Sequence, residues 1–147
     1  MIRKQKMIAT LTQLREMRER KVNDLSSQLA QQKQLVQRYQ NNISALNRLG
    51  GGTGTEVTDA TQLSNLARYK ANIQRVIAWQ TQASALAEKE QDEMQSALIS
   101  HACQEKTVSL VLEQQQQALA KARQQQQQKL TDAQAMQCWL RNRGKLA

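Results

Sequence analysis

The fold is decided by the stretch Gly50-Gly51-Gly52-Thr53-Gly54-Thr55, which gathers four of the five glycines in a chain of 147 residues. A helix does not tolerate such a run, because each interior glycine costs about 1 kcal/mol relative to alanine. On both sides the sequence lacks proline and is rich in helix formers, with 26 glutamines and 18 alanines in the chain. We therefore expect two long helices, a glycine-rich turn over residues 50–60, and a left-handed glycine cap on the first helix. Asp59-Ala60-Thr61-Gln62 is similar to a capping box and is expected to begin the second helix.

Before the turn, apolar residues recur at alternating spacings of three and four, the pattern of a coiled-coil seam. Nine of the twelve positions are apolar, and the seam reads Ile8, Leu11, Arg15, Arg18, Val22, Leu25, Leu29, Gln32, Val36, Tyr39, Ile43 and Leu46.

A longer and weaker seam follows the turn, with fourteen apolar positions among twenty-three. Its first part reads Leu63, Leu66, Lys70, Ile73, Ile77, Gln80, Ser84, Ala87, Gln91, Met94, Leu98, His101, Glu105, Val108 and Leu112. It continues through Gln115, Leu119, Ala122, Gln126, Lys129, Ala133, Met136 and Leu140.

These seams predict an all-α fold, an antiparallel two-helix coiled-coil hairpin with a longer second helix. We expect one domain over residues 1–147, with helices over about 5–49 and 61–142. Pairing Leu46 with Leu63 sets a register in which the numbers of facing residues sum to 109. The last 35 residues then project beyond the first helix, and we expect this glutamine-rich end to be a helix that a partner stabilises.

The expected register also brings opposite charges together, which is a common way to specify register. It places Lys4 opposite Glu105 and Lys21 opposite Glu90. Arg15 and Arg18 are expected near an acidic stretch formed by Glu88, Glu90, Asp92 and Glu93.

Residues that carry catalysis or bind metal are scarce. His101 is the single histidine, and Cys103 and Cys138 lie 35 residues apart on one expected helix, about 50 Å and beyond disulfide reach. The glycine stretch lacks the Lys-Ser/Thr of a phosphate-binding loop. No signal-peptide core and no run of about 20 apolar residues is present. We expect no enzyme activity, no cofactor and no metal, and a cytoplasmic location.

Positive charge is concentrated toward the two termini, since residues 1–48 carry +7 and residues 113–147 carry +4. In a hairpin both regions meet at the terminal end. Such an end is able to bind nucleic acid or anionic membrane, because phosphates attract Lys and Arg. Aromatic residues do not alternate with these charges as single-strand binders require, so a basic end that faces a protein is favoured.

The turn end carries surplus apolar residues beside the seam. Leu35, Leu49, Tyr69 and Val76 flank it on one common edge, and Trp79 lies one turn further on the same side. A two-helix hairpin cannot bury all of them, so they indicate either an interaction surface or ordinary shielding of the seam.

Two local patterns resemble a known family. They are Gln32-x3-Val36-x2-Tyr39-Gln40-Asn41-x-Ile43 before the turn and Asn65-x3-Tyr69-x3-Ile73-x2-Val76-Ile77-x2-Gln80 after it. With the basic hairpin, the early turn and the overhanging second helix, they resemble the FliJ family, the central stalk of flagellar protein export. The injectisome relatives of that family share the architecture.

The resemblance implies a non-enzymatic stalk that inserts its terminal end into a hexameric export ATPase and stimulates it. It also implies a tip that binds the cytoplasmic linker of the export-gate membrane protein, a place at the inner membrane, and export chaperones as further partners. The positions that match the gate-binding surface are Gln32, Val36, Tyr39, Ile43, Tyr69, Ile73, Val76 and Gln80. For the ATPase ring, basic residues near the termini are expected to act, namely Arg3, Lys4, Arg15, Arg18, Lys129, Arg141 and Arg143.

Overall fold

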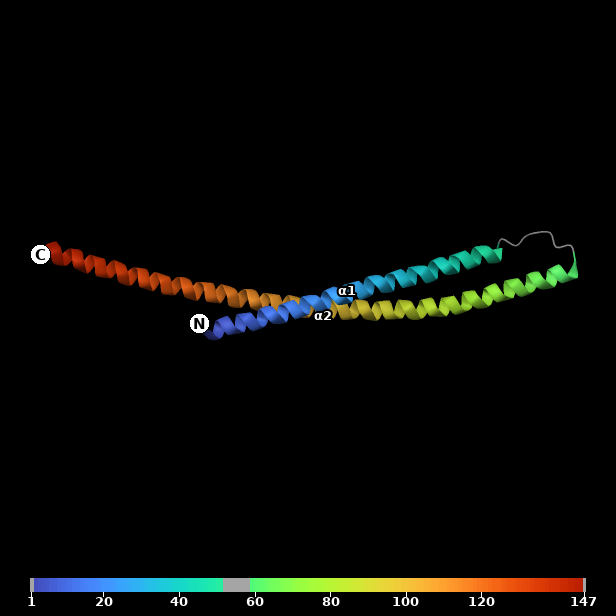
Figure 1. The fold of residues 1–147 in the computed structure, drawn as a ribbon, viewed down its shortest axis with the longest axis horizontal. Helices are drawn as coiled ribbons and strands as arrows, with labels where there is room; N and C mark the ends of the chain where they lie inside the picture. The colour runs from blue at the N-terminus through green and yellow to red at the C-terminus, as the bar shows by residue number, and fades with distance from the viewer. Residues whose placement is uncertain (1, 52–58, 147) are drawn as a thin grey trace. The chain divides into compact units, whose positions relative to one another are not determined.

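The computed structural model describes residues 2–51 and 59–146, and these residues form two helices. Helix α1 spans Ile2–Gly51 and helix α2 spans Ala60–Leu146, 50 and 87 residues respectively. The two helices run antiparallel to one another (Figure 1). This confirms the all-α hairpin with a longer second helix, and each helix is a few residues longer than expected.

The start of α2 is capped as the sequence predicts. Asp59 Oδ1 accepts a hydrogen bond from the backbone N–H of Gln62 at 2.7 Å, and the Asp59 carbonyl accepts one from Leu63 N–H at 3.1 Å. These bonds satisfy backbone donors that an uncapped helix start leaves free.

The expected glycine cap on the first helix is wrong for Gly50 and Gly51. Both lie within α1, and no described glycine has a positive φ. Because α1 continues through them, they take the helical conformation instead of the left-handed one that ends a helix. The other two glycines of the stretch, Gly52 and Gly54, lie outside the described residues.

The chain divides into two compact units, each containing a segment of both helices. The tip unit comprises Lys21–His101, and the terminal unit comprises Met1–Arg20 and Ala102–Ala147.

In the tip unit the core is a single row of seam side chains between the two helices. The buried residues are Leu25, Leu29, Gln32 and Val36 from α1, and Ile73, Ser84 and Ala87 from α2. Every expected seam position of α1 in this unit is buried or half-buried, including the polar Gln32. On α2, Leu63 and Lys70 are exposed, and the other expected seam positions of the unit are not.

In the terminal unit the seam contains fewer buried residues but follows the same heptad pattern. Leu112 is 1% exposed and Leu119 is 8% exposed, while Ile8 and Leu11 of α1 are half-buried. Both helices therefore use the face that the heptad pattern predicts.

The predicted register is wrong in both units. In the tip unit, Gln32 Nε2 donates to the Ala87 carbonyl at 2.9 Å, and a Cβ on Gly50 would lie 3.6 Å from Ile73 Cγ2. In the terminal unit, Arg18 Nη1 donates to Gln104 Oε1 at 2.6 Å. The residue numbers of these pairs sum to 119, 123 and 122, against the expected 109. When seam positions are matched to each other, the sum is 123, a displacement of two heptads from the expected register.

The expected charge pairs are corrected with the register. Arg18 donates a hydrogen bond to Gln104 instead of facing the acidic stretch. Glu90 accepts a hydrogen bond from Gln32 instead of facing Lys21. Since Gln104 lies level with Arg18, its neighbour Glu105 lies about 14 residues from the level of Lys4. A heptad pattern maps onto itself when it is shifted by seven residues, and this is why periodicity alone did not distinguish the registers.

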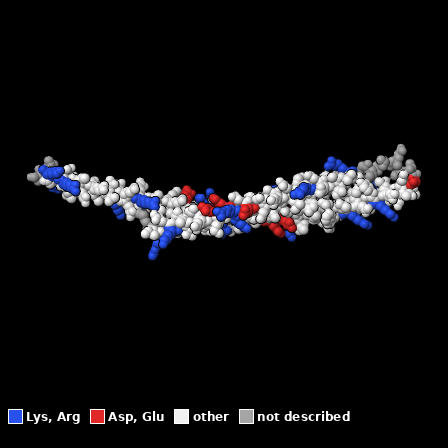
Figure 2. Space-filling view, viewed as in Figure 1, with Lys and Arg blue, Asp and Glu red and all other residues white. Residues whose placement is uncertain are grey.

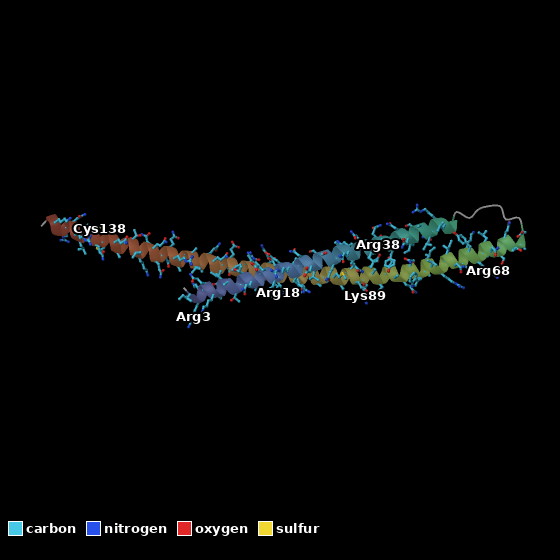
Figure 3. All side chains as sticks on the ribbon, viewed as in Figure 1. Arg3, Arg18, Arg38, Arg68, Lys89 and Cys138 are labelled. Carbon is cyan, nitrogen blue, oxygen red and sulfur yellow. The ribbon has the colours of Figure 1, made fainter. Side chains whose placement is uncertain are left out.

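The overhang at the end of α2 is shorter than the expected 35 residues. Within the terminal unit Ala122 is the last half-buried residue, and every side chain from Arg123 to Lys145 is exposed. The register accounts for this, because position 121 is level with Ile2, the first described residue of α1. Figure 3 shows Cys138 on a part of α2 that has no α1 beside it, whereas Arg18 lies where both helices are present.

Candidate partner-binding surfaces

The terminal unit carries almost all of the net charge of the protein. It contains 13 Lys and Arg against 5 Asp and Glu, a net +8 of the total +9, whereas the tip unit contains 8 against 7. On the face drawn in Figure 2, the Lys and Arg side chains toward the C-terminus of α2 have no acidic side chains beside them. Such an imbalance favours an acidic partner, because opposite charge speeds and orients association.

All seven basic residues expected to contact the ATPase ring lie in the terminal unit. The N-terminal pair, Arg3 and Lys4, are exposed on a helix whose first turn has no acidic residue. Cations at a helix N-terminus oppose the positive end of the helix dipole. An acidic partner surface would relieve this repulsion, which makes the start of α1 a favourable place for one.

Arg15 and Arg18 are half-buried in the seam of the terminal unit. Arg15 Nε lies 3.6 Å from Glu19 Oε1, an ion pair, but it has no hydrogen-bond partner among the described residues. Arg18 donates to Gln104 through Nη1, and its buried Nε likewise has no described hydrogen-bond partner. Each guanidinium therefore retains hydrogen-bonding capacity beyond the contacts shown.

The remaining three, Lys129, Arg141 and Arg143, lie on the exposed end of α2 together with apolar side chains. The Arg143 guanidinium carbon lies 5.2 Å from the centre of the Trp139 ring, a cation–π arrangement. Leu130, Met136, Trp139 and Leu140 are each at least half exposed. The α2 seam thus continues past α1 with nothing among the described residues to cover it.

The tip unit presents a different surface, an apolar stripe on α2. Tyr69, Val76, Trp79 and Leu86 recur at spacings of seven, three and seven, so they lie on one side of the helix. Their exposed fractions are 43%, 41%, 64% and 59%. On α1, Leu35 is half-buried and precedes the seam residue Val36 by one, and Leu49, two heptads further along, is 53% exposed. In an antiparallel pair such positions on the two helices flank the same edge.

The eight positions that the resemblance matches to a gate-binding surface divide into two groups in the structure. Tyr69 and Val76 belong to the apolar stripe and are accessible. The other six are buried or half-buried in the seam, namely Gln32, Val36, Tyr39, Ile43, Ile73 and Gln80. The seam of α1 therefore follows the positions predicted from the heptad pattern.

Leu86 is a surface residue that the sequence analysis did not single out. It follows Trp79 by seven residues, and this spacing could have identified it as a residue on the same side of α2. Below the stripe, Glu88 accepts a hydrogen bond from Gln40 Nε2 at 3.4 Å. The stripe begins near the start of α2 with Tyr69, and Leu86, its last residue, is followed by the exposed acidic stretch that begins at Glu88.

Groups that bind metals or react with substrates are sparse among the described residues. No cluster of three or more His, Cys, Asp or Glu side chains could hold a metal ion there. Cys103 and Cys138 are exposed free thiols, and His101 Nδ1 is buried in the seam. Over the same residues, neither helix has a segment apolar enough to cross a membrane.

Comparison with known proteins adds one finding. The family model of the flagellar FliJ protein matches residues 7–144, nearly the whole chain. No curated protein and no solved structure matches the chain.

Proposed function

Because the chain belongs to the FliJ family of flagellar proteins, a role in flagellar protein export follows, and we propose that the chain is the central stalk of an export apparatus. In this proposal it has no catalytic site and acts only by binding protein partners. Its terminal unit enters the ring of a hexameric export ATPase and stimulates it, and its tip unit binds the cytoplasmic linker of an export-gate membrane protein. The family match over residues 7–144 is the observation that carries the proposal.

The charge distribution supports the assignment of the terminal unit to the ATPase. A net +8, with every Lys and Arg of the unit exposed except Arg15 and Arg18, suits an acidic ring interior. The glutamine run at residues 124–128 adds uncharged hydrogen-bonding surface, which allows a stalk to adopt successive orientations within a ring. Arg3, Lys4, Arg15, Arg18, Lys129, Arg141 and Arg143 are the proposed contact residues.

The apolar stripe supports the assignment of the tip unit to the gate. Tyr and Trp are enriched at protein interfaces, and exposed apolar side chains in a row mark such surfaces. We propose that Tyr69 and Val76 contact the gate directly, with Trp79 and Leu86 extending the surface. The six seam positions are proposed to contribute by holding α2 against α1, or by direct contact if the helices separate on binding.

From these partners we propose a location in the cytoplasm, peripheral to the inner membrane at the export apparatus. Export chaperones are proposed as further partners. An injectisome stalk of the same architecture is the alternative within this class of protein.

Two double variants test the assignment of the ends by co-purification with the cognate ATPase and with the isolated gate linker. Arg141→Glu/Arg143→Glu is expected to lose the ATPase and keep the gate linker. Tyr69→Ala/Val76→Ala is expected to do the opposite. If each double variant lost the other partner, the ends would be assigned the wrong way round.

Matched controls separate local from general effects. Arg68→Glu/Arg75→Glu makes the same charge change on exposed residues of the tip unit. Leu130→Ala removes a 62% exposed apolar side chain from the terminal unit. The charge control should retain the ATPase, and Leu130→Ala should retain the gate linker.

A second candidate function rests on the same basic unit. A net +8 over 66 residues also suits a polyanion, either nucleic acid or an anionic membrane. This candidate predicts that the full chain binds duplex DNA or phosphatidylserine vesicles at 0.15 M salt as tightly as it binds the ATPase. Binding to the ATPase alone at that salt concentration would exclude it.

A further inference from the structure

The apolar stripe of the tip unit repeats like a second coiled-coil seam along α2. Its residues Tyr69, Val76, Trp79 and Leu86 each precede an expected seam position by one. With the half-buried Ala83 they recur at spacings of seven, three, four and three, the pattern that packs one helix against another. Helix α2 therefore carries two helix-packing faces in the tip unit, and the stripe is the face that stays exposed.

Helix α1 adds a leucine beside each end of the stripe. At the turn end, an added Cβ on Gly50 would lie 3.6 Å from Ile73 Cγ2, and Leu49 is the residue before Gly50. Farther along, Gln32 Nε2 donates at 2.9 Å to the backbone carbonyl that follows the last stripe residue, and Leu35 lies one turn away. The apolar surface of this edge therefore belongs to both helices, so a third helix placed on it would contact α1 and α2 together.

The same part of the tip unit carries positive charge without negative charge. Residues 25–49 and 60–87 contain no Asp or Glu, and their six Lys and Arg side chains are all exposed. Arg68 and Arg75 each precede a stripe residue by one position, so they lie on the flank of the stripe that faces away from the seam. Arg38 of α1 lies on the other flank, while Arg68 lies on α2 (Figure 3). An apolar face bordered by exposed cations is complementary to a helix whose apolar face is bordered by Asp and Glu.

Acidic residues end this surface at a defined place. The next two positions of the stripe pattern after Leu86 are Glu90 and Glu93, and both are exposed. The stretch from Tyr69 to Leu86 covers about 26 Å of helix, which a partner helix of about 18 residues matches. The surface therefore has the length of one ordinary amphipathic helix.

A second copy of the chain is a less favourable occupant. Two stripes can be paired antiparallel, with Tyr69 of one copy opposite Leu86 of the other. That arrangement sets Arg68 of one copy beside Lys89 of the other, and both are exposed cations. Like charges at flanking positions disfavour a coiled coil, so an acidic helix is the better match.

We propose that the apolar stripe and its cationic borders bind an acidic amphipathic helix of a partner protein, which packs against α1 and α2 as a third helix. Its apolar side chains cover the stripe, and its Asp and Glu side chains face Arg38, Arg68 and Arg75. This deepens the proposed function by naming the chemistry of the segment that the tip unit binds. Only the identity of the partner as the gate rests on that proposed function.

The test uses a synthetic peptide of three heptads with Leu at the a and d positions and Glu at the e and g positions. A second peptide carries Lys in place of each Glu, and a third carries Gln in place of each Leu. The protein is the full chain with Trp139→Phe, in which Trp79 is the single tryptophan. Trp79 is 64% exposed, so its fluorescence should shift to shorter wavelength when a helix covers it. A peptide bound elsewhere on the chain does not produce this signal.

The three peptides separate the apolar and the electrostatic parts of recognition. At 0.15 M salt we expect the Glu peptide to bind at least about tenfold more tightly than the Lys peptide or the Gln peptide. Tyr69→Ala/Leu86→Ala should weaken the Glu peptide by a similar factor, because it removes two of the four stripe side chains. Circular dichroism checks that the variant keeps the helix content of the parent protein.

Two charge variants test whether the cations beside the stripe recognise the acidic helix. Arg68→Glu/Arg75→Glu should weaken the Glu peptide at least about tenfold and strengthen the Lys peptide. The matched control Lys121→Glu/Arg123→Glu makes the same change on exposed residues of the terminal unit. It should alter the affinity measured at Trp79 by less than about twofold, because salt screens exposed charges outside the site.

Three results would overturn the proposal. The first is no shift of Trp79 fluorescence with the Glu peptide, or equal affinities for the Glu and Lys peptides. The second is equal weakening by the two charge variants, since that indicates general attraction between charges. The third is a shift on concentrating the protein alone, with a doubled mass in sedimentation, because a second copy then covers the stripe.

No gate protein is present in these titrations, so the inference and the proposed function can fail separately. If the gate linker co-purifies with the tip unit while the Glu and Lys peptides bind alike, only the inference fails. If the Glu peptide binds the stripe while the gate linker does not co-purify, the inference holds and the assignment of the gate to the tip unit fails.

Discussion

Leu112 has the largest fully buried side chain in the described structure, with 1% of its surface exposed. Removing buried Leu atoms to leave Ala generally costs about 2–5 kcal/mol of the free energy of unfolding. We expect Leu112→Ala to cost about 2–3 kcal/mol, because only two helices surround the site and the space is easily filled by rearrangement or water. Leu110→Ala, at a 47% exposed position two residues away, should cost less than about 1 kcal/mol. Urea denaturation followed by circular dichroism measures both, and equal losses would show that the α2 seam does not face α1 at this level.

Two seam glutamines should respond differently to replacement by leucine. Gln80 Oε1 has no described hydrogen-bond partner, whereas Gln32 Nε2 donates to the Ala87 carbonyl at 2.9 Å. Gln80→Leu removes an unsatisfied buried group and should raise the free energy of unfolding by about 1 kcal/mol. Gln32→Leu loses a hydrogen bond and should leave the stability unchanged or lower it by about 1 kcal/mol. The same urea experiment compares them, and a Gln80→Leu protein less stable than the Gln32→Leu protein would contradict the hydrogen-bond assignment.

At the scale of the helix, the end of α1 can be strengthened through its glycines. Gly50 and Gly51 are helical, and no described glycine has a positive φ. An added Cβ at Gly50 meets Ile73 Cγ2 at an ordinary 3.6 Å, and at Gly51 it meets nothing within 4 Å. Each change to alanine should therefore stabilise the protein by about 0.5–1 kcal/mol. A lower thermal midpoint for Gly50→Ala/Gly51→Ala would show that these residues serve instead as the left-handed cap that the sequence predicted.

The helices also show which features the sequence could predict. The alternating apolar pattern identified all twelve seam positions of α1, including Arg15, Arg18 and Gln32, and the start of α2 at Asp59 was recognised from its capping pattern. The register was not predictable in the same way, because each apolar layer of a heptad pattern finds another apolar residue seven or fourteen positions away. The register that pairs Leu46 with Leu63 also brings opposite charges together, so charge did not reveal that it was wrong. The structure instead selects a register with cross-helix hydrogen bonds from Gln32 and Arg18.

The candidate surfaces were predictable to a similar degree. Basic residues near both termini follow from composition, and the hairpin brings them into one terminal unit. The apolar stripe was recognised in part, since Tyr69, Val76 and Trp79 were placed beside the seam while Leu86 was missed. Which of the eight positions proposed to bind the gate are accessible depends on packing, and the sequence could not separate Tyr69 and Val76 from the six in the seam.

At the scale of the whole molecule, positive charge is concentrated in the terminal unit and an exposed apolar stripe lies in the tip unit. The terminal unit carries +8 of the net charge, and the tip unit carries the exposed row of Tyr69, Val76, Trp79 and Leu86. A protein with two such different surfaces is suited to bind two different partners at once. The central claim is that the terminal unit stimulates an export ATPase while the tip unit does not take part in that stimulation.

The most direct test is the ATP turnover of the cognate hexameric ATPase with each form of the protein added. The full chain and Tyr69→Ala/Val76→Ala are both expected to raise turnover equally. Deletion of residues 123–147, which removes only exposed described side chains, and Arg141→Glu/Arg143→Glu are expected to abolish the increase. Loss of stimulation with the tip variant, together with full stimulation by the deletion, would contradict the account.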